Sequence, residues 1–436
     1  MDDHDEVEVP HYFLCPISLQ IMKDPVTTAT GITYDRSSIE RWLKEAVVNE
    51  PVCPVTKQPL PSQHLTPNHT LRRLIQGWCV ANANRGVERI PTPKPVLCRA
   101  HVLKILRGLS VPRLQSASLD QLLSLISTTS EDEHAKDDDR KLMAECGVVK
   151  AMASLIITCY KDNKTTFLNE ALRILTAVWV PANVSSEVRT IVSDNIDLVD
   201  AITWVLFDKN VQRRTHAVNL INEVVKVAGS SLVERLKPEF FKGVVGILLD
   251  RQNNDDNNNN KNINVGQMKA ALRVLLEVCQ HGRNRHRIIE ANTIFHLIEI
   301  ELELGLAQSE KNKKMSELIF CLLAQLCSCA DGRAQFLAHS GGMAVVSKRI
   351  LRVSAVVDDR AVHVFGLIAK FSATKEVLHE MLKVGAVSKL CMVLQADCAK
   401  YLKDKVREML RMHASAWNNS PCIQVYLLTR YPMLQF

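Results

Sequence analysis

A chain of 436 residues is long enough for two or more domains, or for one domain followed by an array of repeats. Hydrophobic residues make up 47% of it and aromatic residues only 5%, a balance that favours stacked helices over a β-sandwich. The net charge is +7, but residues 1–100 carry 11 acidic and 11 basic residues, so the surplus is spread over 101–436 without a Lys/Arg block. A nucleic-acid groove would concentrate basic residues with aromatics, and we expect no nucleic-acid partner.

The cysteines and the apolar runs indicate the compartment. Thirteen cysteines, an odd number without a signal peptide ahead of them, predict reduced intracellular thiols. The longest apolar run, residues 318–330, contains Gln325 and is too short to cross a bilayer. We therefore expect a soluble cytoplasmic protein, with the nucleus left open, and no membrane insertion.

The first segments of the chain are an acidic tail and two short loops that open with Cys-Pro. Residues 1–9 contain five acidic residues, which predicts a solvated tail. The loops lie at 13–17 and 53–56, and between them 26–29 and 32–34 flank Thr30-Gly31. This pattern predicts a hairpin, because glycine readily adopts positive φ.

Two helices are expected around the second loop. The first follows Asp35, where Ser37 and Glu40 have the S-x-x-E spacing of a capping box, and it ends before Pro51. Its apolar face is Ile39, Leu43 and Val47. Asn68 is the predicted cap of the second helix. Apolar residues of that helix fall at three- and four-residue spacings: Leu71, Leu74, Ile75 and Trp78.

Metal ligation is not expected in this region. Its cysteines and histidines are Cys15, Cys53, Cys79, His4, His11, His64 and His69. A cross-brace that binds two zinc ions needs four ligands per ion, mostly as C-x-x-C pairs, and no such pair occurs before residue 80. We predict no metal and no cofactor, and a fold held by packing and hydrogen bonds.

The motifs of this region resemble those of the U-box, the zinc-free relative of the RING domain found in ubiquitin ligases. They include residues 13–17 (FLCPI), 24–26 (DPV), 31–36 (GITYDR), 53–56 (CPVT) and 65–71 (LTPNHTL). The prolines of residues 90–95 (IPTPKP) predict a stiff spacer. This spacer resembles the linker of plant U-box proteins with armadillo repeats, in the subgroup associated with immune and stress signalling.

The resemblance implies a set of site residues. A groove that docks the ubiquitin-conjugating enzyme would involve Ile17, Leu19, Trp42 and Pro54, although Trp42 also suits a core position beside Ile39. Lys57 occupies the position where many such ligases place an arginine that bridges the conjugating enzyme and ubiquitin. The residues expected to have structural roles, with the two cysteines buried rather than catalytic, are Cys15, Asp24, Pro25, Gly31, Tyr34, Asp35, Arg36 and Cys53.

From residue 101 onward the pattern changes to helix after helix. Short motifs that open apolar helices recur at 146–149, 195–199, 240–245, 291–294, 340–343 and 384–387, roughly every 44–50 residues. This spacing is close to the armadillo period. Helices at 403–416 and 422–431 would close the array, and Gly282-Arg283 and Gly332-Arg333 would be matching turns. Two polar insertions, 131–140 and 250–264, are expected to be mobile loops.

These expectations combine into a mainly α protein with a small α+β zinc-free RING-like domain and an α-solenoid. The predicted parts are a tail at 1–9, a U-box at 10–84, a linker at 85–100 and an armadillo superhelix at 101–436. The implied function is that of an E3 ubiquitin ligase without a covalent ubiquitin intermediate, whose partners are a conjugating enzyme, ubiquitin and a protein substrate held by the repeats. A non-enzymatic scaffold is the alternative function, and homo-oligomerisation is left open.

Overall fold

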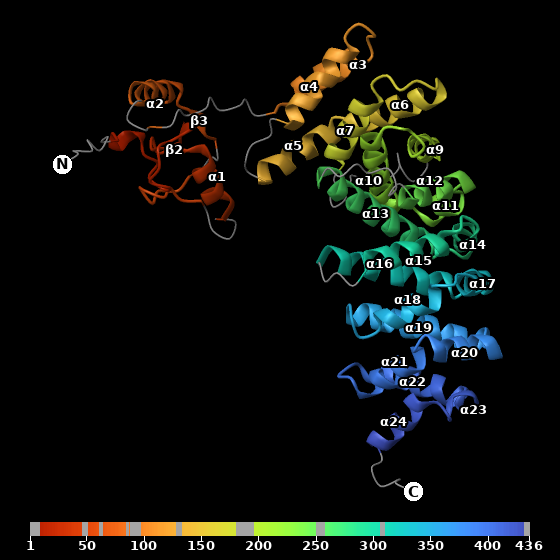
Figure 1. Cartoon of the computed structure of the whole chain (residues 1–436). Helices are drawn as coiled ribbons and strands as arrows, with labels where there is room; N and C mark the ends of the chain where they lie inside the picture. Colours follow the sequence, from red (N-terminus) through yellow and green to blue (C-terminus); the bar gives the residue numbers. More distant parts are fainter. Residues whose placement is uncertain are drawn as a thin grey trace. The chain divides into compact units, whose positions relative to one another are not determined.

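A computed structural model describes residues 9–45, 51–60, 64–83, 87, 97–127, 133–179, 196–249, 258–305 and 310–430 (Figure 1). The chain divides into two units, Met1–Leu97 and Cys98–Phe436. Most of the predicted tail and most of the predicted linker lie outside the described residues. In the described part, no single helix is long and apolar enough to cross a membrane. One bent pair of helices, Asp138–Glu145 with Val148–Lys161, would be long and apolar enough only if its two members are counted together.

The N-terminal unit contains a three-stranded antiparallel sheet with the order β2-β1-β3. The strands are β1 (Pro25–Thr27), β2 (Thr33–Asp35) and β3 (Thr66–Pro67), and Val26 lies opposite Tyr34 in β2 and Pro67 in β3. The predicted hairpin is therefore present. Gly31 takes a φ of +79° in its turn, a conformation that L side chains rarely adopt.

Two helices and a short 3₁₀ turn complete this unit. They are η1 (His11–Phe13), α1 (Arg36–Glu45) and α2 (His69–Ala81). A shared core joins them to the sheet and to both Cys-Pro loops, and its buried members are Phe13, Cys15, Met22, Val26, Tyr34, Ile39, Cys53, Leu60, Ile75 and Cys79. Asn68 caps α2 as predicted, because its side chain accepts a hydrogen bond from the Leu71 N–H at 3.0 Å.

Two details of these helices differ from the prediction. The helix α1 begins at Arg36, so Ser37 lies inside it, and the Ser37 hydroxyl donates to the Asp35 carboxylate at 2.8 Å instead of capping the helix. The prediction of a capping box is therefore wrong, because the carboxylate of Asp35, a stronger acceptor, lies immediately before the helix. In α2 the Leu74 side chain is 57% exposed, since it lies off the stripe that buries Ile75. Val47 lies outside the described residues.

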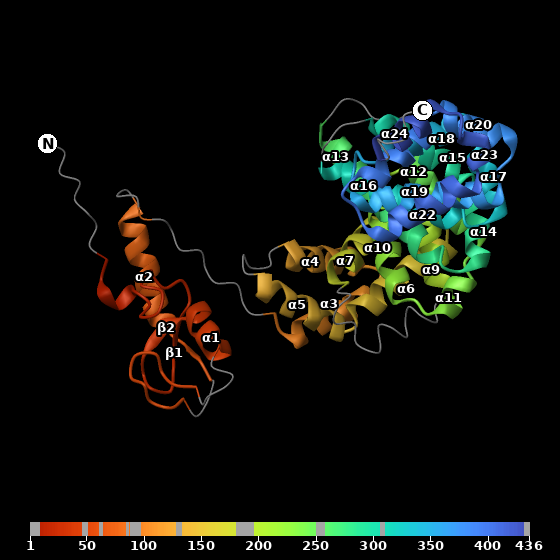
Figure 2. The same ribbon diagram turned by 90° about the horizontal axis from the view of Figure 1, so that it is seen from below.

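The second unit is built from stacked helices (Figures 1 and 2). Longer helices form one ladder in which each packs on the next: α4 (Gln115–Ser127), α7 (Leu168–Val178), α10 (Val211–Val227), α13 (Asn258–Val278), α16 (Glu310–Leu326), α19 (Ala355–Phe371) and α22 (Lys400–Met412). A second ladder contains α6 (Val148–Lys161), α9 (Ile196–Val205), α12 (Pro238–Leu249), α15 (Thr293–Leu304), α18 (Gly342–Arg349), α21 (Ala386–Gln395) and α24 (Pro421–Arg430).

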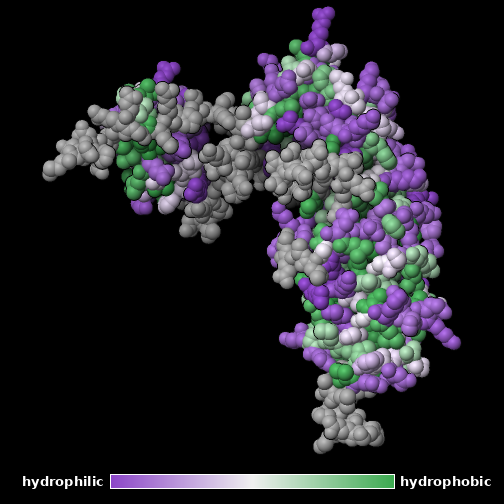
Figure 3. All heavy atoms as spheres, in the orientation of Figure 1, coloured by the Kyte–Doolittle hydropathy of each residue, from purple (hydrophilic) through white to green (hydrophobic). Residues whose placement is uncertain are grey.

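Shorter helices connect the two ladders, while α3 (Arg99–Leu109) precedes α4 and α5 (Glu133–Glu145) lies between α4 and α6. The connecting helices are α11 (Ser230–Glu234), α14 (Gly282–Glu290), α17 (Ala330–Ala338), α20 (Lys375–Lys383) and α23 (Ala414–Trp417). Each recurring motif lies at or near the start of a helix of the second ladder, as predicted. The face in Figure 3 is largely hydrophilic over this unit, with separate hydrophobic patches. Apolar side chains are buried where one repeat stacks on the next.

Both predicted loop insertions are helical where the structure describes them, so those predictions are wrong. Of 131–140, the residues from Glu133 onward belong to α5, which packs on α6 and α7 and buries Met143. Of 250–264, the residues from Asn258 onward belong to α13, which is held between α10 and α16. Stacking against neighbouring helices outweighs the weak helix propensity of asparagine and aspartate.

The matching Gly-Arg turns are also wrong. Gly332 lies within α17, and a Cβ there would meet the Leu326 carbonyl oxygen at 2.0 Å, so the position requires glycine. Arg285 and Arg333 occupy equivalent places instead. They donate to the carbonyls of Cys279 and Cys327, respectively, six residues earlier in each case. At the end of the array, the single helix predicted at 403–416 is broken at His413 into α22 and α23.

Candidate functional site

The two Cys-Pro loops of the N-terminal unit have the same conformation. In each loop the cysteine N–H donates to a glutamine carbonyl five residues later at 2.8 Å, and the cysteine carbonyl accepts from the N–H four residues later. The residue at that fourth position is left-handed in both loops, with a φ of 57° at Leu19 and 59° at Lys57. The sequences CPISLQ (15–20) and CPVTKQ (53–58) are therefore structural equivalents, in which Ile17 corresponds to Val55 and Leu19 to Lys57.

The cysteine sulfurs are fully buried acceptors of hydrogen bonds. The Sγ of Cys53 lies 3.3 Å from the Thr30 hydroxyl, 3.0 Å from the Tyr34 hydroxyl and 3.5 Å from the Thr56 N–H. Burial alone would raise the pKa of Cys53, but the hydrogen bonds from Thr30, Thr56 and Tyr34 outweigh it and lower the pKa to about 6. Burial and the bond to Cys53 raise the pKa of Tyr34.

Cys15 is also hydrogen-bonded, mainly by backbone N–H groups. Its Sγ accepts the Asp35 N–H at 3.3 Å, and backbone hydrogen bonds lower its pKa against the opposing effect of burial. Strand β2 therefore contacts both sulfurs, with Tyr34 bonded to one and Asp35 to the other. Neither cysteine is exposed to a substrate. In the described part of the chain no three His, Cys, Asp or Glu side chains gather as a metal site would require.

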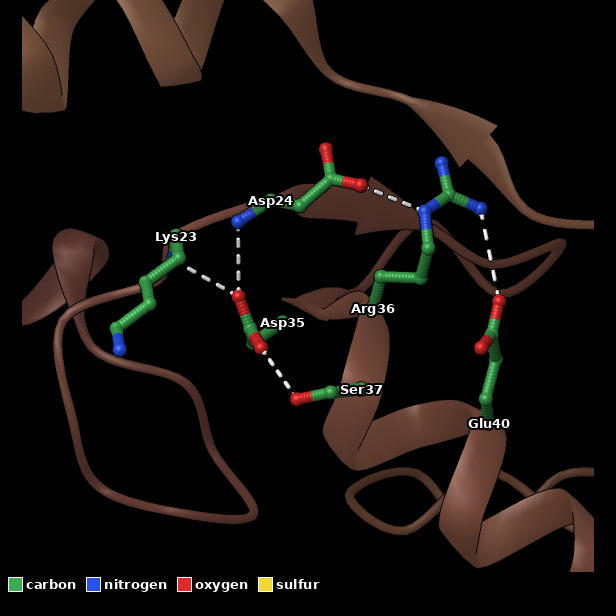
Figure 4. A network of polar contacts seen from close by, with 6 residues as sticks. All are labelled: Lys23, Asp24, Asp35, Arg36, Ser37 and Glu40. Carbon is green, nitrogen blue, oxygen red and sulfur yellow. Dashed lines mark hydrogen bonds and ion pairs between the residues drawn. The ribbon is translucent and has the colours of Figure 1, made fainter. Parts of the chain in front are cut away.

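A polar network fixes the end of the first loop to the start of α1 (Figure 4). One Asp35 carboxylate oxygen accepts the backbone N–H groups of Lys23 and Asp24 at 2.8 and 2.9 Å. The Arg36 guanidinium donates to Asp24 at 2.6 Å and lies 3.7 Å from Glu40. Pro25, which follows this network in β1, is buried. These charge-assisted bonds join segments that are a dozen residues apart in the sequence.

Trp42 links α1 to the second loop. Its Nε1 donates to the Val52 carbonyl at 2.9 Å, and the Lys57 ammonium lies 5.8 Å from the centre of its ring. The ring is half-buried and packs against the core of the unit. It therefore has both a core-facing part and an accessible part.

The remaining predicted docking residues differ widely in exposure. Leu19 is 75% exposed, whereas Ile17 and Pro54 are half-buried. Val55, which the sequence analysis did not select, is 51% exposed, and its N–H donates to the Tyr34 hydroxyl at 3.4 Å. The correspondence between the two loop sequences is the signal that would have identified Val55 as the equivalent of Ile17. Exposed apolar side chains on two anchored loops suit a small protein interface better than a catalytic pocket.

Comparisons with known proteins agree with this geometry. The U-box domain model matches residues 9–84, and the model of the plant U-box protein ARM repeat region matches residues 101–433. The chain belongs to the plant U-box proteins with armadillo repeats. Three similar relatives are E3 ubiquitin-protein ligases of Arabidopsis thaliana, namely PUB24 (38% identity, 98% of this chain and 97% of the relative), PUB23 (39%, 98% and 98%) and PUB22 (36%, 98% and 99%).

The family determines the type of chemistry. U-box E3 ubiquitin-protein ligases are RING-type transferases that form no covalent intermediate with ubiquitin, and they work with a conjugating enzyme. The buried positions of Cys15 and Cys53 in this U-box agree with that mechanism, because no thiol of the two loops is accessible to accept ubiquitin.

Proposed function

We propose that this U-box docks a ubiquitin-charged conjugating enzyme through the tips of its two loops and the accessible part of Trp42. The contact residues are Ile17, Leu19, Trp42 and Pro54, with Val55 added from the structure. The armadillo repeats hold the protein substrate, so that its lysines stand beside the charged enzyme. The observation that supports docking best is the exposure of Leu19, a large apolar side chain that is 75% exposed on a loop anchored by a fully buried cysteine.

The proposed mechanism is one of proximity and orientation. The conjugating enzyme carries ubiquitin as a thioester on its own cysteine, and the ligase holds that conjugate near an acceptor lysine. Holding reactants in the correct geometry lowers the entropic part of the barrier without any catalytic base from the ligase. Lys57 lies over the Trp42 ring at the edge of the proposed surface, where its ammonium can donate to the conjugate.

We also propose a substrate-binding surface on the repeats and a biological role for the protein. A ladder of long helices presents an extended surface, which is how helical repeat arrays bind partners. An immune or stress response of the plant is supported by the resemblance of residues 90–95 to the linker of that subgroup. The cytoplasm remains the proposed location.

Leu19→Ala tests the docking surface without disturbing the core. We expect ubiquitin discharge from the charged conjugating enzyme to free lysine to fall by about tenfold at subsaturating ligase, because loss of a central interface side chain costs about 1–2 kcal/mol. Single-turnover discharge measured on the full chain gives the result. The circular dichroism spectrum and melting temperature should remain those of the parent.

Leu74→Ala is the matched control for this experiment. It removes the same side chain from the same domain at a position that is 57% exposed on α2. We expect its discharge rate to stay within about twofold of the parent. Equal rates for both variants would show that the conjugating enzyme docks elsewhere on the U-box.

A further inference from the structure

A pocket in the armadillo array lies outside both the U-box and the ladder of long helices. It is formed by three consecutive helices of the second ladder, α6, α9 and α12, with Phe207 from the turn after α9 and Lys237 from the segment before α12, and has a volume of about 340 Å³. One face of α9 contributes Asp200, Thr203 and Trp204 at three- and four-residue spacing, and Phe207 lies in the turn that follows this helix. A volume of this size accommodates one large side chain or a small ligand.

Aromatic rings form the walls of the pocket, and they are held in place. Tyr160 of α6 and Trp204 have ring centres 6.0 Å apart at an angle of 54°. Phe207 is 58% exposed, yet its ring rests against Gly243 of α12, where an added Cβ would meet the Phe207 Cε2 at 3.3 Å. Exposed aromatic side chains that are already ordered lose little conformational entropy when a partner binds.

Two polar features give the pocket chemical specificity. The Thr203 hydroxyl is buried, with the residue 6% exposed, and it has no hydrogen-bond partner within the described structure. Asp200 and Lys237 form an ion pair at 2.5 Å, and the Lys237 side chain is 57% exposed. An unpaired buried hydroxyl carries an energetic cost that a ligand can remove by bonding to it.

These features identify the occupant by its chemistry. Aromatic walls favour an aromatic ring in an edge-to-face or offset arrangement. The Thr203 hydroxyl favours a ring that carries a hydrogen-bonding atom. The carboxylate and ammonium of the ion pair match the N–H and C=O of a peptide backbone, and the exposure of Phe207 and Lys237 shows that this side of the pocket is open to a longer chain.

We propose that this pocket binds an aromatic anchor residue of a partner peptide, with a polar ring atom of the anchor bonded to Thr203 and its backbone paired with Asp200 and Lys237. The anchor is a tyrosine or a tryptophan of another protein. Binding at this pocket is separate from the U-box, and it is measurable without any ubiquitin transfer.

Fluorine NMR of the full chain labelled with 5-fluorotryptophan tests the proposal directly. The chain has five tryptophans, and the Trp204 signal is assigned with a Trp204→Phe variant. The probe is the peptide N-acetyl-Gly-Tyr-Gly-amide. We expect a saturable shift of the Trp204 signal with a Kd of about 1 mM, as suits a ligand of this size, while the four other signals stay unchanged. No saturable shift of Trp204 up to about 20 mM, some twentyfold above that Kd, would overturn the proposal.

Two further ligands separate the contributions of the ring and the backbone. The same peptide with phenylalanine in place of tyrosine should bind about threefold to tenfold more weakly, because it cannot bond to Thr203. The tyrosine side chain alone, as p-cresol, should bind several-fold more weakly than the tyrosine peptide. Equal affinity of p-cresol and the peptide would refute a peptide partner and indicate a small aromatic ligand instead.

Three variants locate the site. Thr203→Val keeps the shape of the side chain and should abolish the preference for tyrosine over phenylalanine. Phe207→Ala should weaken binding by about fivefold or more, as loss of an aromatic contact does. Phe371→Ala, at a position 57% exposed on α19, is its matched control and should bind like the parent. Unchanged binding by Phe207→Ala, or an undiminished tyrosine preference in Thr203→Val, would contradict the assignment.

Discussion

The two Cys-Pro loops of the U-box share one backbone conformation but differ in the chemistry that they expose. At the left-handed position the first loop presents Leu19 and the second presents Lys57. The sulfur of Cys53 is bonded by the Thr30 and Tyr34 hydroxyls and by a backbone N–H, whereas the sulfur of Cys15 is bonded mainly by backbone N–H groups. One loop is therefore more apolar at its tip, and the other is more polar at both its tip and its base.

This difference separates the backbone of the loops from the side chains at their tips. The backbone of each loop is held by the same pair of main-chain bonds, so it does not depend on the residue at the tip. The tip is then free to differ, with an exposed apolar side chain at Leu19 and a charge from Lys57 beside Trp42. The following predictions test that division between the two loops.

The largest expected effect is on stability. Cys53→Ala leaves the buried Tyr34 hydroxyl and the Thr30 hydroxyl without their sulfur partner and also creates a small cavity, so we expect the U-box to lose about 3–4 kcal/mol of unfolding free energy. Cys15→Ala should cost about 2 kcal/mol, because it leaves neither the Thr30 nor the Tyr34 hydroxyl without its partner. Urea unfolding of residues 1–97 at pH 8 measures both. Equal losses would mean that packing, not hydrogen bonding, determines the role of the two sulfurs.

The pH dependence of stability should follow Cys53. The pKa of Cys53 is lowered in the folded state from its ordinary value of 9.0 to about 6. The ionised thiolate therefore adds its full contribution to the unfolding free energy above pH 9, and this contribution is lost as the pH falls towards 6. The unfolding free energy of the same fragment should therefore fall by up to about 2 kcal/mol between pH 8 and pH 6. Cys53→Ala should flatten this slope more than Cys15→Ala does, and an unchanged slope in Cys53→Ala would assign the titration to another group.

The smallest expected effect concerns catalysis at Lys57. Arginine offers a rigid fork of donors where lysine offers one flexible charge, so Lys57→Arg should speed single-turnover ubiquitin discharge by about threefold to tenfold. Lys57→Ala should slow it by a similar factor. Lys57→Leu, which copies the first loop, should behave like Lys57→Ala, because each variant keeps the same left-handed backbone. The affinity for the conjugating enzyme should change by less than about twofold. Identical discharge rates for all four proteins would leave Lys57 without a part in transfer.

Local sequence signals by themselves determined the U-box elements and the helical array. Gly31 marks the hairpin turn because it tolerates positive φ, and Asn68 caps α2 because its side chain reaches the next free N–H groups. The repeating motifs predicted where helices of the second ladder begin. Each of these signals acts within a few residues of its own position, so the sequence shows it directly.

The tertiary structure decided everything that depends on contacts between distant segments. Asp35 lies directly before α1, and its carboxylate accepts the N–H groups of Lys23 and Asp24, which lie directly before β1. Residues from Glu133 form a helix because α6 and α7 pack against it. The pocket beside Thr203 exists only where α6, α9 and α12 meet. Stacking brings these side chains together because it buries apolar surface. The free energy of that burial depends on two segments at once, so neither segment alone specifies how they align.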